Sequence, residues 1–451
     1  MKTLVVGAGG GGIASALLAG LRGEETTLVE AHASIGGCAS YFKRGPFVFD
    51  VGATTVSGIG EDEPLGRLFS LLGSKPDLVP ADPGIVFHLS SGKTLSYYRD
   101  FEKWMRELEK NFPELNHRPF WSLVQKVNRD GWRLLRNVHT FPPQNLNEFF
   151  SILNYPASIK LLPNLFLSTE LMLKHFGLFE KEYLELINGI LIISAQSESH
   201  KTPFMVGAMA LAYPSETYVP VGGMKGLMDY FERELERLKI TVKKKTKVTE
   251  LPKEERVILN LPVWNLAELS NEFTREAETH PGHWGSFVLY FGVKSEISSP
   301  YHQIHLNHPD VKNYFVSFSL PGDNLRAHVG YQTVVISTHE IAKSWYVLSE
   351  EEYLARKKHL EAIIMDDFKS RFKVDEIKFL MSGTPKTFES FTGRKFGFVG
   401  GVPFLHGKNP FSLLSPVTNL KEVYRVGDTI FPGQGLCGVV AGALQLHDRL
   451  R

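Results

Sequence analysis

Three glycines near the N-terminus have the spacing of a phosphate-binding turn. Gly7, Gly9 and Gly12 follow a short apolar run, Thr3 to Val6, and begin a segment with apolar residues at helical spacing. The first glycine permits a tight turn out of a strand, the second lets backbone approach a pyrophosphate, and the third lets helix and strand pack closely. Unpaired N–H groups at the helix start then face the phosphates. The pattern predicts a dinucleotide site.

An acidic residue stands where such a site needs one. Glu30 ends a second predicted strand, Thr26 to Val29, at the roughly twenty-residue separation typical of this motif. A carboxylate there accepts hydrogen bonds from ribose hydroxyls and repels a 2′-phosphate. The motif alone does not distinguish NAD from FAD.

Two further glycine motifs resemble those of the amine-oxidase and phytoene-desaturase group of flavoproteins. Gly36-Gly37 lies just past Glu30, and Val426-Gly427-Asp428 lies near the C-terminus. In that group the double glycine loop passes under the flavin and the late Gly-Asp contacts the ribityl chain, whose hydroxyls need an acceptor. The resemblance implies FAD. A turn or N-cap role is the alternative for Asp428.

Within that group the chain most resembles the bacterial phytoene desaturases and the carotenoid isomerases. The resemblance covers nearly the whole chain and is carried by residues 36–42, 49–52, 218–224, 387–392 and 432–435. It implies an FAD-dependent oxidoreductase acting on a carotenoid or similar apolar polyene, either by hydride transfer to flavin N5 or by redox-neutral cis/trans isomerisation. No catalytic residue is predicted, because a hydrocarbon substrate offers no polar group by which to find one.

The expected FAD contacts combine the first motif with positions that the resemblance adds. They are Gly7, Ala8, Gly9, Gly10, Gly12, Glu30, Gly36, Gly37, Cys38, Thr54, Val248, Gly427, Asp428, Gly435 and Leu436. Cys38 departs from the family, since many relatives carry a basic residue there. Only one dinucleotide motif is recognised, so we expect electrons to pass to a quinone, oxygen or another external carrier, or no net electron transfer.

The same fold also serves other functions, which are alternatives for this chain. An amine, a porphyrinogen or a retinoid could be the substrate, although no aromatic cage for an amine is recognised. A prenyl-lipid carrier without catalysis is a third reading. The intact phosphate motif argues against it, because a carrier needs no cofactor.

The order of helix and strand patterns along the chain predicts an α/β fold of two domains. Strand–turn–helix patterns occur at the start, middle and end of the chain. This order predicts a discontinuous Rossmann-like FAD domain of residues 1–84, 215–285 and 405–451. Residues 85–214 and 286–404 would form a substrate domain with a mixed or antiparallel sheet and a helical cap. A strand is also expected around Val248.

The amino-acid composition limits the classes of partner and the compartment that we expect for this chain. Lys and Arg total 50 against 49 Asp and Glu, a net charge of +1, which gives no electrostatic reason to expect nucleic acid. The two cysteines favour a reducing, cytoplasmic setting. No signal peptide or spanning helix is predicted. Because an apolar substrate comes from a membrane, we expect peripheral attachment through the helical region between about residues 100 and 215.

Three weaker features have ordinary explanations. His302, His305 and His308 could form a metal site, but they are assigned to a proline-containing loop and no metal is predicted. Cys38 and Cys437 could be neighbours at the redox centre, although small buried side chains are the simpler reading. A run of Lys243, Lys244, Lys245 and Lys247 fits a solvated sheet edge, with anionic lipid as the alternative.

Overall fold

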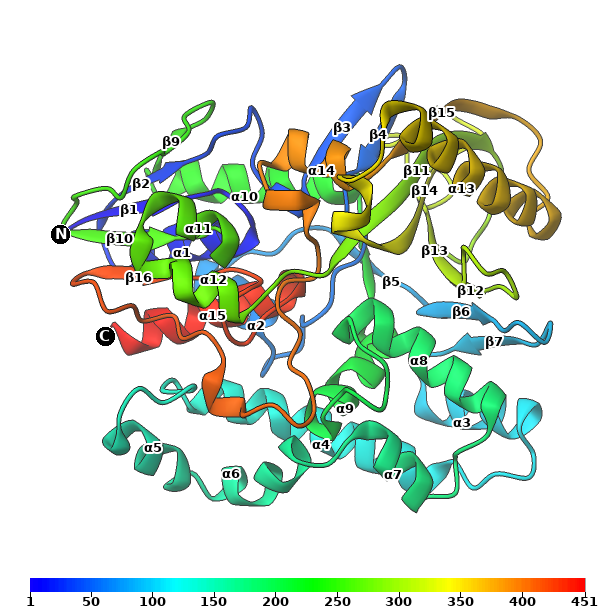
Figure 1. Ribbon diagram of the computed structural model, residues 1–451, viewed down its shortest axis with the longest axis horizontal. Helices are drawn as coiled ribbons and strands as arrows, with labels where there is room; N and C mark the ends of the chain where they lie inside the picture. The colour runs from blue at the N-terminus through cyan, green and yellow to red at the C-terminus, as the bar shows by residue number, and fades with distance from the viewer. Residues whose placement is uncertain (451) are drawn as a thin grey trace.

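The parallel sheet of the molecule is assembled from three distant parts of the chain. The computed structural model describes residues 1–450, apart from the side chains of residues 156–158. Five parallel strands lie in the order β16-β10-β1-β2-β9. They are β1 (Lys2–Val6), β2 (Glu25–Val29), β9 (Thr241–Lys243), β10 (Arg256–Leu259) and β16 (Val423–Arg425). Strands from the start, middle and end of the sequence therefore lie side by side (Figure 1).

A second sheet of seven strands forms the other half of the molecule. Its order is β15-β11-β14-β13-β12-β6-β7, and its neighbours are antiparallel except for β12 and β6. The strands are β6 (Ile85–His88), β7 (Thr94–Tyr97), β11 (Trp284–Lys294), β12 (Tyr301–His305), β13 (Asn313–Phe318), β14 (Tyr331–Ile341) and β15 (Ile377–Gly383). Two small ribbons, β3 (Tyr41–Arg44) with β4 (Phe47–Asp50) and β5 (Leu78–Pro80) with β8 (Tyr218–Pro220), join the halves.

Helices cover both sheets and form a separate layer. Helices α1 (Gly10–Leu21), α2 (Pro64–Leu72), α10 (Gly223–Arg237) and α15 (Gly435–Arg449) share one apolar core with the parallel sheet. Helix α13 (Glu350–Arg371) packs on the seven-stranded sheet. The short helices α11 (Val263–Leu269) and α12 (Thr274–Thr279) pack on the parallel sheet, whereas α14 (Pro385–Thr392) lies against β11 and β15 of the seven-stranded sheet.

The helical layer lies below both sheets in Figure 1. It comprises α3 (Phe101–Asn111), α4 (Arg118–Asn137), α5 (Leu146–Leu153), α6 (Pro156–Leu161), α7 (Thr169–His175), α8 (Lys181–Ala195) and α9 (Phe204–Ala212). Its large buried side chains, among them Trp104, Trp121 and Phe204, form one core with the β6–β7 hairpin. Among residues 1–450, no helix is both long enough and apolar enough to cross a membrane.

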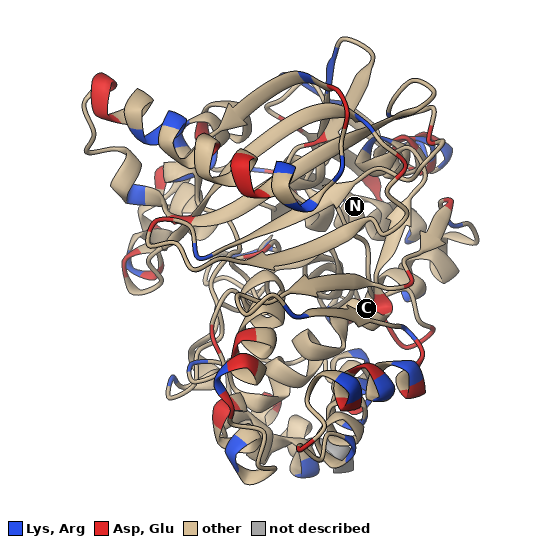
Figure 2. Cartoon of the chain, turned by 90° about the vertical axis from the view of Figure 1, so that its right-hand side faces the viewer, with Lys and Arg blue, Asp and Glu red and all other residues tan. Residues whose placement is uncertain are grey.

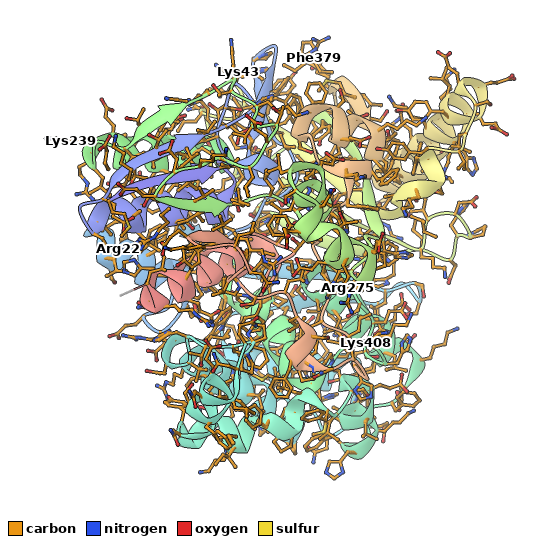
Figure 3. All side chains as sticks on the ribbon, turned by 60° about the vertical axis from the view of Figure 1, so that its left-hand side comes forward. Arg22, Lys43, Lys239, Arg275, Phe379 and Lys408 are labelled. Atoms are coloured by element: carbon orange, nitrogen blue, oxygen red, sulfur yellow. The ribbon has the colours of Figure 1, made fainter. Side chains whose placement is uncertain are left out.

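Charge is distributed over the surface without a dominant sign. Lys, Arg, Asp and Glu are interspersed along the helices, whereas the strands of the seven-stranded sheet carry few of them (Figure 2). Lys43 and Lys239 point away from the molecule (Figure 3). This pattern agrees with the near-zero net charge.

The predicted mixed α/β fold with a Rossmann-like part is confirmed, while several local predictions need correction. Val248 lies in no strand. Its segment follows edge strand β9, and there the Lys245 N–H donates to the His32 carbonyl and the Thr246 N–H donates to the Glu30 carbonyl. His302 and His305 lie in strand β12, not in a loop.

We propose that the division into two domains follows the two sheets. The boundary expected at residue 285 falls inside β11 (Trp284–Lys294), so the proposed boundary moves to the residues before this strand. The other expected boundaries, at 84, 214 and 404, fall outside the regular strands and helices α1–α15.

Candidate functional site

The glycine turn after β1 needs glycine for steric reasons. Gly7 has a positive φ of 93°. A Cβ on Gly12 would lie 1.9 Å from the carbonyl oxygen of Gly7, so only glycine allows α1 to start this close to the strand. The α1 N-cap, Gly9, makes no side-chain capping bond, which leaves the first N–H groups of the helix free for an anion.

Glu30 closes the turn from the end of β2. Its Oε2 accepts a hydrogen bond of 2.7 Å from the Ala8 N–H, and its Oε1 accepts one of 2.8 Å from the His32 N–H. A carboxylate has further lone pairs, and Glu30 also lines the central cavity. The side chain is thus fixed in place and retains the capacity to accept bonds from ribose hydroxyls.

The double glycine loop lies directly against this turn. Gly36 has a φ of 112°, its N–H donates to the Ala8 carbonyl at 2.7 Å, and it forms a parallel bridge with Gly9. A Cβ on Gly37 would lie 3.3 Å from the Gly9 Cα, so the two backbones are in close contact. The two loops form one continuous glycine floor.

A second helix N-terminus faces the same space. Helix α15 starts at Gly435, and its N-cap Gln434 makes no side-chain capping bond. A Cβ on Gly10 would lie 2.6 Å from Leu436 Cδ1, which shows how closely the starts of α1 and α15 approach. Two helix N-termini with uncapped N–H groups therefore border one cavity, an arrangement suited to a pyrophosphate.

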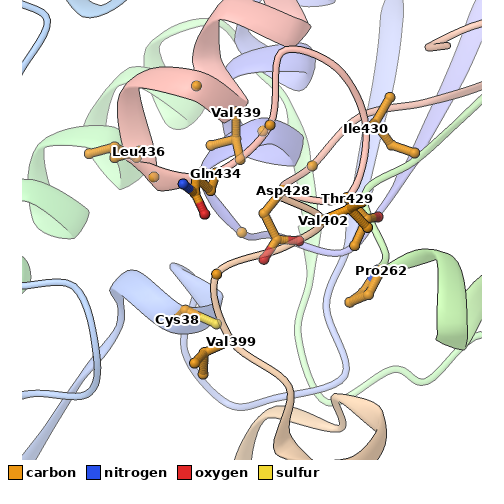
Figure 4. A pocket seen from close by; sticks show the side chains of 18 of the residues that line it. Cys38, Pro262, Val399, Val402, Asp428, Thr429, Ile430, Gln434, Leu436 and Val439 are labelled. Atoms are coloured by element: carbon orange, nitrogen blue, oxygen red, sulfur yellow. The ribbon is translucent and has the colours of Figure 1, made fainter. Parts of the chain in front are cut away.

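Asp428 is held by an arginine that lies outside the sequence motifs. Arg394 donates to Asp428 Oδ2 at 2.7 Å and to the Phe398 carbonyl at 2.7 Å. Their side chains are 11% and 19% exposed. Figure 4 shows Asp428, Cys38 and Gln434 pointing into the same space. Burial raises the pKa of the Cys38 thiol despite the nearby Arg394, so Cys38 is a neutral thiol at pH 7.

One cavity of about 820 Å³ connects the expected contacts with an apolar region. Thirteen of the fifteen expected residues line it. The other two lie behind the wall: Ala8 donates to Glu30, and Gly12 packs under Gly7. The cavity continues along side chains of the helical layer, including Trp132, Leu135, Val138, Phe141, Ile152, Leu161, Leu165, Met205 and Met209.

Sequence motifs missed several residues of this wall. Gly11 lines it, and Asn260, at the end of β10, donates to the Gly7 carbonyl at 3.0 Å. The strand end before Asn260 was a usable signal, since polar residues there face the ligand edge of a parallel sheet. Arg394 and His339 also line the cavity, but they approach from distant segments and no local spacing marks them.

The structure shows where the two cysteines, the histidines and the lysine run lie. Cys38 lies beside Arg394 and Asp428, whereas Cys437 contacts Gly58, and both thiols are free. His302 contacts His88, while His305 on the opposite strand face contacts Glu185. The residues that the structure describes contain no group of three or more His, Cys, Asp or Glu side chains able to hold a metal. The lysine run borders edge strand β9.

Comparison with known proteins gives matches over part and over all of the chain. Residues 5–72 match the family model described as NAD(P)-binding Rossmann-like domain. Prolycopene isomerase of Daucus carota is 23% identical over 98% of this chain and 79% of the relative. Phytoene desaturase (lycopene-forming) of Pseudescherichia vulneris is 33% identical, over 30% of this chain and 28% of the relative.

A solved structure shares the fold along the whole chain. A putrescine oxidase variant with a redesigned cofactor site superimposes with a TM-score of 0.63 at 15% identity, covering 100% of this chain and 97% of that one. At this identity the match shows the fold alone. Together the comparisons support the resemblance carried by the motifs: the chain is an oxidoreductase that is similar to carotenoid desaturases and isomerases.

Proposed function

We propose that this protein binds FAD and uses it to desaturate or isomerise a carotenoid or a similar apolar polyene. One observation carries the proposal. A single cavity joins a dinucleotide-type wall of glycines, Glu30 and Asp428 to an apolar arm lined by the helical layer. A cofactor and an apolar chain can therefore meet inside the protein.

The residues present fit FAD better than a nicotinamide dinucleotide. Glu30 suits the ribose of the adenosine half, and the starts of α1 and α15 suit the pyrophosphate. Asp428 then offers an acceptor for ribityl hydroxyls, with Arg394 fixing its orientation. Val248 and Lys247 line the cavity at the adenine end, near Glu30.

The protein's part in the reaction is to orient the substrate and exclude water. When bound, the flavin supplies a hydride acceptor for an allylic C–H bond. Apolar side chains of α4, α6 and α9 line the arm of the cavity and hold the polyene through apolar contacts. In desaturation the electrons pass on to an external quinone or oxygen, whereas isomerisation transfers none overall.

An exposed apolar surface adjoins the substrate arm. Leu146, Phe150, Ile159 and Phe166 are 74%, 58%, 59% and 56% exposed, and we call them the apolar face. They lie in or beside α5, α6 and the turn 162–165, whose other side chains, including Ile152 and Leu161, line the cavity. The proposal is that this face rests on a membrane and that polyenes enter beneath it.

The cofactor assignment is tested by the visible spectrum of the purified protein. We expect a yellow protein that releases about one FAD per chain on denaturation. Replacement of Glu30 by lysine should abolish retention, because it removes the ribose acceptor and the Ala8 bond. The matched control Glu25→Lys alters an exposed residue of the same strand and should retain FAD. A colourless wild-type protein that cannot be reconstituted contradicts the proposal.

A further inference from the structure

The wall of the cavity formed by the seven-stranded sheet is unexpectedly polar. Ser286, His339 and Asn313 form a row across three adjacent strands. Ser286 pairs with His339 between β11 and β14, and the register that pairs Phe315 with Ser337 places Asn313 opposite His339. All three side chains line the cavity, and we call them the polar row.

Hydrogen bonds fix the orientation of the polar row. His339 Nε2 lies 2.8 Å from the Oε1 of Gln196, so this nitrogen carries the proton and Nδ1 is left as an acceptor. Gln303 donates to Asn313 Oδ1 at 3.2 Å, so the Asn313 amide N–H groups are left as donors. The row therefore presents both a donor and an acceptor.

A buried amide beside the row lacks a partner. Gln303 is fully buried at the cavity wall, and its Oε1 has no hydrogen-bond partner among the residues that the structure describes. A pure hydrocarbon beside this wall leaves such groups unsatisfied at a cost in free energy. The wall is built for a ligand that carries a polar group.

The polar group that fits is uncharged. Burial lowers the pKa of His339 to about 4, so the ring is neutral at pH 7. The ionisable carboxylates and cations lining the cavity, Glu30, Lys247, Glu268, Arg394 and Asp428, belong to its cofactor wall. An ionised carboxylate or amine at the row would be desolvated without a counter-charge.

We propose that the substrate is a polyene alcohol, whose hydroxyl group binds at the polar row. The hydroxyl accepts a bond from the Asn313 amide and donates to His339, while the hydrocarbon chain lies in the apolar arm. This inference rests on the proposed function and specifies its substrate class. It assigns Asn313 and His339 as binding residues and Gln303 and Gln196 as residues that position them.

The test compares two probes that differ only in the hydroxyl group. All-trans-retinol and axerophthene, the hydrocarbon with hydrogen in place of its hydroxyl, are titrated into the FAD-loaded protein and followed by polyene absorbance. We expect retinol to bind at least tenfold more tightly, because sites built for a hydroxyl discriminate strongly against its absence. Equal or tighter binding of the hydrocarbon to the wild-type protein overturns the inference without any variant.

Substitutions in the polar row test which residues cause the preference for retinol over axerophthene. Asn313→Leu and His339→Leu should weaken the binding of retinol and bring the ratio of the two dissociation constants close to one, with FAD content unchanged. The control Thr333→Val removes a hydroxyl from β14, the strand of His339, at a position that does not line the cavity. This variant should keep the preference for retinol. Loss of FAD from the Asn313 or His339 variants would place the row in the cofactor site and contradict the inference.

The same experiment separates this inference from the proposed function. A protein that binds FAD and prefers axerophthene contradicts only the alcohol class. A protein that prefers retinol but never holds FAD contradicts the cofactor assignment. Failure of the FAD-loaded protein to bind either probe contradicts both the alcohol class and the proposed polyene substrate.

Discussion

At the scale of single residues, the ion pair of Arg394 and Asp428 is the most informative feature of the cofactor wall. The family resemblance leads to the expectation of a basic residue directly after the double glycine, where this chain has Cys38. Here Arg394 reaches the same neighbourhood from the segment after α14 and contacts Asp428 at 2.7 Å. A mostly buried carboxylate that loses its cation is left uncompensated.

Arg394→Met should therefore weaken FAD binding at least tenfold, because Asp428 loses the partner that orients it. The measurement is the dissociation constant for FAD by fluorescence quenching. Arg118→Met is the matched control, since Arg118 forms an exposed pair with Glu102 away from the cavity that contributes only about 0–1 kcal/mol. Equal effects of the two substitutions would show that Arg394 has no special role.

At the scale of elements, two partly buried glutamates connect three helical segments. Glu63 precedes α2, and Glu216 lies at the end of the turn 213–216, where it accepts a 2.7 Å bond from Asn128 of α4. Burial, reinforced by the charge of Glu63, raises the pKa of Glu216 to about 8. The pair therefore shares a proton at neutral pH.

This pair predicts a loss of stability in alkali. The pKa of Glu216 is raised above its value in the unfolded chain, so the stabilisation is complete at low pH and is lost as pH rises through about 8. Glu216→Gln, whose amide keeps the hydrogen bond to Glu63, should flatten the decline in Tm between pH 6 and 9. The exposed control Glu61→Gln should leave the decline unchanged. An identical decline in wild type and Glu216→Gln would refute the shared proton.

The same scale shows how far sequence reasoning reaches. The β1–α1–β2 unit was predictable because each step has a local requirement, such as the 1.9 Å approach that excludes a Cβ at Gly12. Arg394, His339 and Asn313 were not predictable, because strand pairing and chain reversal bring them to the cavity from distant segments. The prediction of a strand at Val248 was wrong, because an apolar residue just past an edge strand does not by itself provide a strand for the chain to pair with.

At the scale of the whole molecule, the apolar face predicts membrane attachment. Replacing Leu146, Phe150 and Ile159 with serine should reduce co-sedimentation with lipid vesicles at least tenfold, because each buried side chain contributes about 1.5–3 kcal/mol. Val347→Ser, at an 83% exposed residue before α13, is the control and should not change it. Undiminished binding of the triple variant would place the membrane contact elsewhere.

The proposed function requires a polyene to react inside the cavity that also holds FAD. The most direct measurement is incubation of the FAD-loaded protein with polyene-containing liposomes, followed by chromatography and absorbance spectra of the extracted polyene. New conjugated double bonds are expected for a desaturase, and a changed cis/trans pattern under reducing conditions is expected for an isomerase. A polyene recovered unchanged under both oxidising and reducing conditions, from protein with a full complement of FAD, would contradict the account.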